Sequence, residues 1–92
     1  MMIEKAGIPH RKDTIIEKLL ENEIVLYNQT DHHVHSLNLT AGIIWNFCDG
    51  TMTVQAMIDH LLEKCKGDKQ LIEEDCLKTL SEMEQKNLIT IK

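Results

Sequence analysis

Three histidines within four residues, His32, His33 and His35, are the densest group of potential metal ligands in the chain. On a strand, His33 and His35 would lie on one side about 7 Å apart, a span that one metal ion can bridge. Two ligands do not make a site, and no spacing supplies a third, for instance from His60 or a cysteine. We therefore predict a polar, partly solvated strand and assign no metal.

The three cysteines, Cys48, Cys65 and Cys76, are an odd number without CxxC spacing, which favours reduced thiols over disulfides. Cys65 and Cys76 recur on apolar helical stripes, where a free cysteine usually packs as a small hydrophobe. The sequence contains no GxSxG, HExxH, phosphate-binding glycine loop or EF-hand pattern. We therefore expect neither an enzyme nor a bound cofactor.

The bulk composition predicts one small globular domain. With 92 residues, of which 42% are hydrophobic, the chain has room for one core, and we expect a single domain over residues 1–92 with an ordered core at about residues 9–91. A net charge of -5 disfavours nucleic acid. The start of the chain carries Glu4 and no long apolar stretch, so we expect no signal peptide, no membrane span and a cytoplasmic location.

Strand-forming residues dominate the first part of the chain. The run Ile24–Tyr27 predicts a strand, residues 28–31 a turn, and His33–Leu37 the return strand of a hairpin. Residues 14–20 are ambiguous, because their isoleucines and leucines recur at helical spacing while Pro9 upstream argues against a long helix. Periodicity alone predicts a helix there.

Three helices are predicted after residue 38, each with a capping residue. Asn38 or Thr40 caps the first, Thr53 the second and Asp68 the third. Apolar side chains at helical spacing mark the core faces of the second and third helices. These are Val54, Met57, Ile58, Leu61, Leu62 and Cys65 in the second, and Leu71, Ile72, Cys76, Leu77, Leu80 and Met83 in the third.

Turn-forming residues predict where these helices end. Asp49-Gly50 should stop the first helix in a glycine C-cap, and residues 66–68 should end the second. Asn87 should close the third helix in a left-handed conformation, after which Leu88–Ile91 can form a short terminal strand.

The order and spacing of several short motifs resemble PqqD-like proteins over about residues 9–89. The motifs are Leu37-Asn38, Ala41-Gly42-Ile43-Ile44-Trp45, Cys48-Asp49-Gly50 with Thr53-Val54, Glu74-Asp75-Cys76-Leu77, and Leu88-Ile89. The resemblance implies an α+β, winged-helix-like fold, in which a three-stranded antiparallel sheet precedes a three-helix bundle. It makes residues 14–19 the first strand, against the local periodicity.

The resemblance also implies a function. PqqD-like proteins are non-catalytic peptide chaperones that present the leader of a ribosomally synthesised precursor peptide to a radical SAM enzyme, as in PQQ biosynthesis. An edge strand can accept an extended peptide as one more strand, which is physically consistent with this role.

The peptide-binding site implied by the resemblance lies between the third strand and the third helix. The implied strand residues are His33, Val34, His35, Ser36 and Leu37; on the helix, Asp75, Lys78, Thr79 and Glu82 would set side-chain preference, and Leu71 and Cys76 would form an apolar floor. We hypothesise that His33 or His35 accepts an acidic leader residue, more strongly when protonated.

Two alternatives remain open at this stage. Three helices followed by a strand also fit a winged-helix DNA-binding regulator or a scaffold subunit, although the predicted third helix is rich in acidic residues. The exposed edge strand also leaves a homodimer open.

Overall fold

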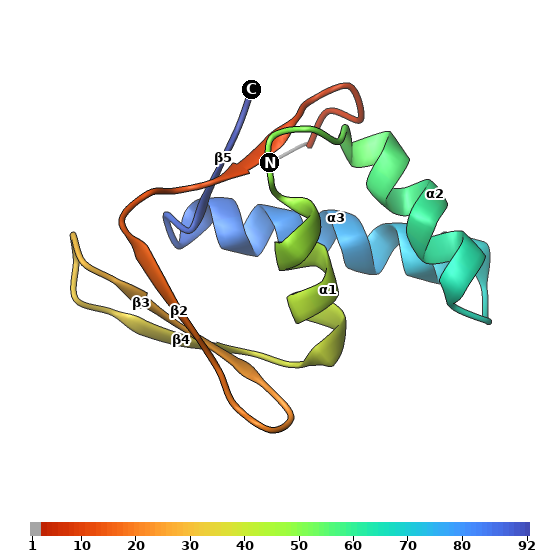
Figure 1. Cartoon of the computed structure of the whole chain (residues 1–92). Coiled ribbons are helices and arrows are strands. Elements are labelled where there is room, and N and C mark those ends of the chain that lie inside the picture. Colours follow the sequence, from red (N-terminus) through yellow and green to blue (C-terminus); the bar gives the residue numbers. More distant parts are fainter. Residues whose placement is uncertain (1–2) are drawn as a thin grey trace.

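The computed structural model describes residues 3–92, which form five strands and three helices. Strands β2 (Ile15–Leu19), β3 (Ile24–Asn28) and β4 (Val34–Leu37) make an antiparallel sheet in the order β2-β3-β4. Strands β1 (Pro9–Arg11) and β5 (Ile89–Ile91) make a separate antiparallel pair. The helices are α1 (Leu39–Phe47), α2 (Val54–Lys64) and α3 (Lys69–Gln85), and they pack on one side of the larger sheet (Figure 1).

The fold class implied by the resemblance is confirmed, including the strand nature of residues 15–19. The helix suggested by periodicity is wrong here. Ile16 and Leu19 are 51% and 77% exposed, so these residues form no buried helical face. Their backbone instead pairs with β3, from Ile15 opposite Asn28 to Leu19 opposite Ile24.

Alternation along β3 connects the sheet to the core. Ile24, Leu26 and Asn28 point inward, where the two aliphatic side chains join the core cluster. Asn28 is a buried polar side chain, and both of its polar atoms have hydrogen-bond partners. Its Nδ2 donates to the Asn87 carbonyl at 3.3 Å, and its Oδ1 accepts from the Thr30 amide at 2.9 Å. The sheet is thereby joined to the chain just beyond α3.

All three helices begin at predicted capping residues. The side chain of Asn38 accepts from the amide of Ala41, and Thr53 accepts from Ala56. Asp68 accepts from the first turn of α3 in the same way. Of the two caps considered for α1, the structure uses Asn38 rather than Thr40.

Two predictions about helix ends are wrong. Cys48 is the C-cap of α1, and Gly50, at φ +84°, lies two residues further on, where its amide donates to the Pro9 carbonyl. Cys65 is exposed rather than buried, because α2 ends at Lys64 and the backbone of Cys65 is already extended. Asn87 does take the predicted left-handed conformation, at φ +61°.

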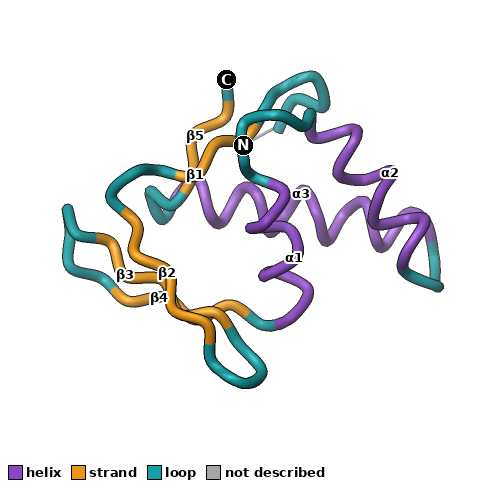
Figure 2. Tube along the Cα trace, viewed as in Figure 1, coloured by secondary structure: helices purple, strands orange, loops and turns teal. Residues whose placement is uncertain are grey.

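Strand β1 was missed by the sequence reasoning. It lies beside β5, from Pro9 opposite Ile91 to Arg11 opposite Ile89, so that the start and end of the described chain meet (Figure 2). The carbonyls of Lys5 and Gly7 accept hydrogen bonds from the first amides of α2. None of the helices formed by residues 3–92 is both long enough and apolar enough to cross a membrane.

Candidate peptide-binding groove

Strand β4 is an edge strand, because it pairs with β3 on one side only. The Asn28 amide donates to the His33 carbonyl at 3.0 Å, which sets the hydrogen-bonding phase of the pair. Since bonded and non-bonded pairs alternate in an antiparallel ladder, His35 and Leu37 bond to β3, and the N–H and C=O groups of Val34 and Ser36 point outward. Among the described residues, no turn, loop or helix hydrogen-bonds to the backbone of Val34 or Ser36.

A hollow of about 440 Å³ lies along this open edge, between β4 and α3. Its floor has apolar contributions from Leu37, Met83 and Leu88, which are largely buried. Exposed charged residues of α3 border its far side, and the first residues of α1 close one end. The lining residues are His35, Ser36, Leu37, Asn38, Thr40, Ala41, Asp75, Lys78, Thr79, Glu82, Met83, Lys86 and Leu88.

Most of the site residues implied by the resemblance lie on this groove. From the strand these are His35, Ser36 and Leu37, and from the helix Asp75, Lys78, Thr79 and Glu82. His33 precedes β4 and Val34 lies on its outer face, 64% exposed; neither side chain lines the hollow. Sequence reasoning did not include Met83, Lys86 and Leu88, although the helical spacing of Met83 and Lys86 from Thr79 and Glu82 indicates the same face.

The apolar floor expected from Leu71 and Cys76 has a different composition in the structure. Cys76 is completely buried and Leu71 is 58% exposed, and neither residue lines the groove. The two residues are five positions apart, which places them about 140° apart around a helix, so they do not share a face. Leu37, Met83 and Leu88 provide the apolar surface instead.

Comparison with known proteins identifies the family. The family model described as coenzyme PQQ synthesis protein D (PqqD) matches residues 23–89, which include the whole groove. The chain belongs to the PqqD family. No curated protein sequence matches the chain significantly.

Two solved structures share the fold of this PqqD-family chain. TbiB1, in complex with the TbiA(beta) leader peptide, superposes with a TM-score of 0.78 and 18% identity, covering 87% of this chain and 93% of TbiB1. A lasso peptide synthetase B1 complexed with the leader peptide superposes with a TM-score of 0.80 and 13% identity, covering 90% and 98% of the respective chains. At these identities the likeness establishes the fold.

His35 is the titratable residue of β4 that lines the groove. Its Nε2 is buried and has no hydrogen-bond partner within the described chain. Burial, and after it the positive charge of Lys86, lower the pKa of His35, while Asp31 opposes them. At neutral pH His35 is therefore an uncharged ring with one buried polar atom that has no partner among residues 3–92.

The other two histidines of the cluster are held elsewhere. His32 has a left-handed backbone, and its Nδ1 lies 2.7 Å from the Tyr27 hydroxyl. The rings of His33 and His35 meet edge to face at 6.2 Å, and His33 lies 3.7 Å from Asp31. Within residues 3–92 no group of three histidine, cysteine or carboxylate side chains is arranged to hold a metal ion.

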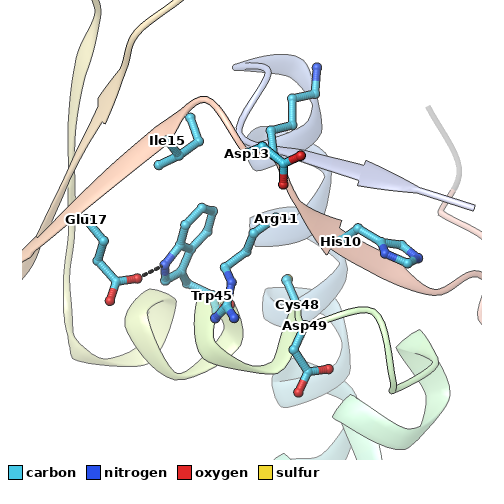
Figure 3. Close-up of a pocket in the computed structure, with 9 residues that line it drawn as sticks. His10, Arg11, Asp13, Ile15, Glu17, Trp45, Cys48 and Asp49 are labelled. Atoms are coloured by element: carbon cyan, nitrogen blue, oxygen red, sulfur yellow. Dashed lines mark hydrogen bonds between the residues drawn. The ribbon is translucent and has the colours of Figure 1, made fainter.

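A second hollow, of about 400 Å³, lies between β1, β2 and α1 (Figure 3). The guanidinium of Arg11 lies 5.9 Å from the centre of the Trp45 ring and donates to the Trp45 carbonyl, while Glu17 accepts from the indole N–H. These polar groups are engaged in joining β1 and β2 to α1. In the described part of the chain, the β4 and α3 groove has backbone groups without a partner and charged side chains that make no ion pair, and it is the better candidate site.

Proposed function

We propose that this chain is a non-catalytic peptide-binding protein that recognises the leader segment of a ribosomally synthesised precursor peptide. Membership of the PqqD family supports this proposal, as do the leader peptides in the complexes of the two structural neighbours. The observation that carries it is the open edge of β4 beside a groove walled by α3.

In this proposal the two parts of the groove have separate tasks. An extended peptide gains affinity by pairing its main chain with the outward N–H and C=O groups of Val34 and Ser36. These main-chain hydrogen bonds can form with a peptide of any sequence. Every second side chain of that peptide then faces the helices, next to His35 and the exposed residues of α3. In this proposal the backbone supplies affinity and α3 supplies selectivity.

We also propose the remaining parts of the pathway by family resemblance. The protein that receives the bound precursor is a radical SAM enzyme, and both work in the cytoplasm. A second copy of this chain can compete for the same strand edge, so a homodimer formed through β4 would be displaced by the leader peptide.

The test is an NMR titration of ¹⁵N-labelled protein with leader peptides from precursor genes adjacent to its own gene. We expect shifts in residues 33–37 and 75–86, and slower hydrogen exchange at the amides of Val34 and Ser36. In the hydrogen-exchange measurement, the amides of His35 and Leu37 are the internal controls, because they already bond to β3. A scrambled leader and duplex DNA are the external controls; perturbation by DNA and by none of the leaders would overturn the proposal in favour of a winged-helix regulator.

A further inference from the structure

A row of alternating charges runs along the wall that α3 contributes to the groove. Asp75, Lys78, Glu82 and Lys86 all line the hollow and are accessible to solvent along its rim. At 100° per residue these four positions fall within an arc of about 80° on the helix surface. The side chains thus form one row of negative, positive, negative and positive charge.

The last three charges of this row match the spacing of a β-strand. Lys78, Glu82 and Lys86 are four residues apart, or about 6 Å at each step along the helix. Side chains on one face of an extended peptide recur about every 6.6–6.8 Å. Over two steps the mismatch is about 1.5 Å, which the long lysine side chains can absorb. Asp75 lies only about 4.5 Å before Lys78 and is out of step.

The row also runs along the strand edge to which a peptide would be added. His35, near the start of β4, lies close enough to Lys86 for that charge to lower its pKa, and Asn28 of β3 bonds to the chain at Asn87. Strand β4 therefore starts beside the C-terminal end of α3, and the two elements run in opposite directions (Figure 1). A peptide paired with β4 passes each charge in turn.

Within residues 3–92, none of these four charges forms an ion pair with another side chain. The ion pairs among residues 3–92 join Lys5 to Glu73 and His33 to Asp31, and neither includes a member of the row. Charges four apart on a helix can pair with each other, but Lys78, Glu82 and Lys86 do not do so here. His35, whose buried Nε2 has no partner in the described chain, lines the same groove as Lys86.

We propose that the groove selects leader segments with the pattern acidic, any, basic, any, acidic. The acidic side chains would lie beside Lys78 and Lys86, and the basic one beside Glu82. This pattern reads the same in both directions, so it holds whether the peptide runs parallel or antiparallel to β4. The inference rests on the proposed function, to which it adds the chemical class of the leader.

The test is selection from a displayed library of randomised twelve-residue peptides, with the wild-type chain and two variants as bait. Glu82→Lys reverses the central charge of the row. Glu84→Lys is the matched control, because it makes the same change on the opposite face of α3, outside the groove. The folded state of each variant is checked by circular dichroism and thermal unfolding.

We expect the wild type to enrich the proposed pattern, Glu82→Lys to replace the central basic residue by an acidic one, and Glu84→Lys to behave as the wild type. Each matched charge should strengthen binding of an enriched peptide about two- to fivefold, an effect that added salt weakens. Enriched peptides without charge preference at alternate positions, or equal effects of the two variants, would overturn the inference and leave the proposed function standing. A wild-type chain that enriches no peptide would refute both.

Discussion

Replacing Val34 by proline tests the strand-addition mechanism at one backbone atom. The Val34 amide points away from β3, opposite the non-bonded partner Tyr27, so proline removes a donor that the folded chain does not use. Edge strands tolerate proline at such positions. We therefore expect Val34→Pro to fold and to lose peptide binding.

The expected loss of peptide-binding free energy in Val34→Pro follows from the one hydrogen bond that cannot form. A peptide carbonyl facing the substituted position would be desolvated without a donor, which costs about 1–3 kcal/mol. The dissociation constant of the leader peptide should rise about 5- to 150-fold. The Val34 side chain contributes little to this figure, because it is 64% exposed and lies outside the groove lining.

The assay is isothermal titration calorimetry with one leader peptide against the wild type, Val34→Pro and Val34→Ala. The alanine variant is the matched control, since it loses the side chain and keeps the N–H, and it should bind within about threefold of the wild type. Urea unfolding of all three proteins separates a binding defect from a folding defect. A folded Val34→Pro protein with wild-type affinity would refute peptide addition at this edge.

Three further predictions concern individual side chains. Burial and neighbouring positive charge lower the pKa of His35 below its ordinary 6.5, so its contribution to stability is present above about pH 6.5 and is lost as the pH falls through the lowered pKa. Measured by urea unfolding, the His35→Gln variant should therefore lose less stability than the wild type when the pH is lowered from about 7.5 to about 5.5. Burial raises the pKa of Cys48 to about 12 and that of Cys76 to about 11, so mass spectrometry after iodoacetamide treatment should find only the exposed Cys65 modified in the folded protein and all three in urea. Asn38→Ala removes the cap of α1 and should lower the free energy of unfolding by about 1 kcal/mol; an unchanged urea midpoint would contradict the capping role.

Local signals in the sequence were sufficient for the helices and insufficient for two strands. Asn38, Thr53 and Asp68 cap helices through bonds to amides two or three residues away, so sequence alone predicts them. Strand β2 has a helix-like apolar period and becomes a strand only because β3 pairs with it. Strand β1 depends on β5, about 80 residues away along the chain, and no local pattern predicts that pairing.

The candidate site could be predicted only in part, because local spacing along the sequence predicts some of its residues and long-range contacts bring in the others. Residues on one helical face, such as Lys78, Thr79 and Glu82, follow from spacing once α3 is known to face the strand edge. Lys86 lies just beyond the last residue of α3, and only the structure brings it beside His35. Which amides of β4 point outward depends on the phase of the β3–β4 ladder, which the bond between Asn28 and His33 determines.

The shared winged-helix shape raises the question of why this chain should recognise a peptide rather than DNA. In a winged-helix regulator the third helix enters the major groove and needs positive charge against the phosphates. Residues 70–86, from α3 into its C-cap, hold five acidic residues, Glu73, Glu74, Asp75, Glu82 and Glu84, against two lysines, Lys78 and Lys86. Both lysines line the groove beside β4, where they alternate with Asp75 and Glu82. A polyanion would meet repulsion at every second position of this row, whereas a peptide of alternating charge would meet none. The charge of α3 thus favours an extended peptide in the groove between α3 and β4 over DNA as the bound partner.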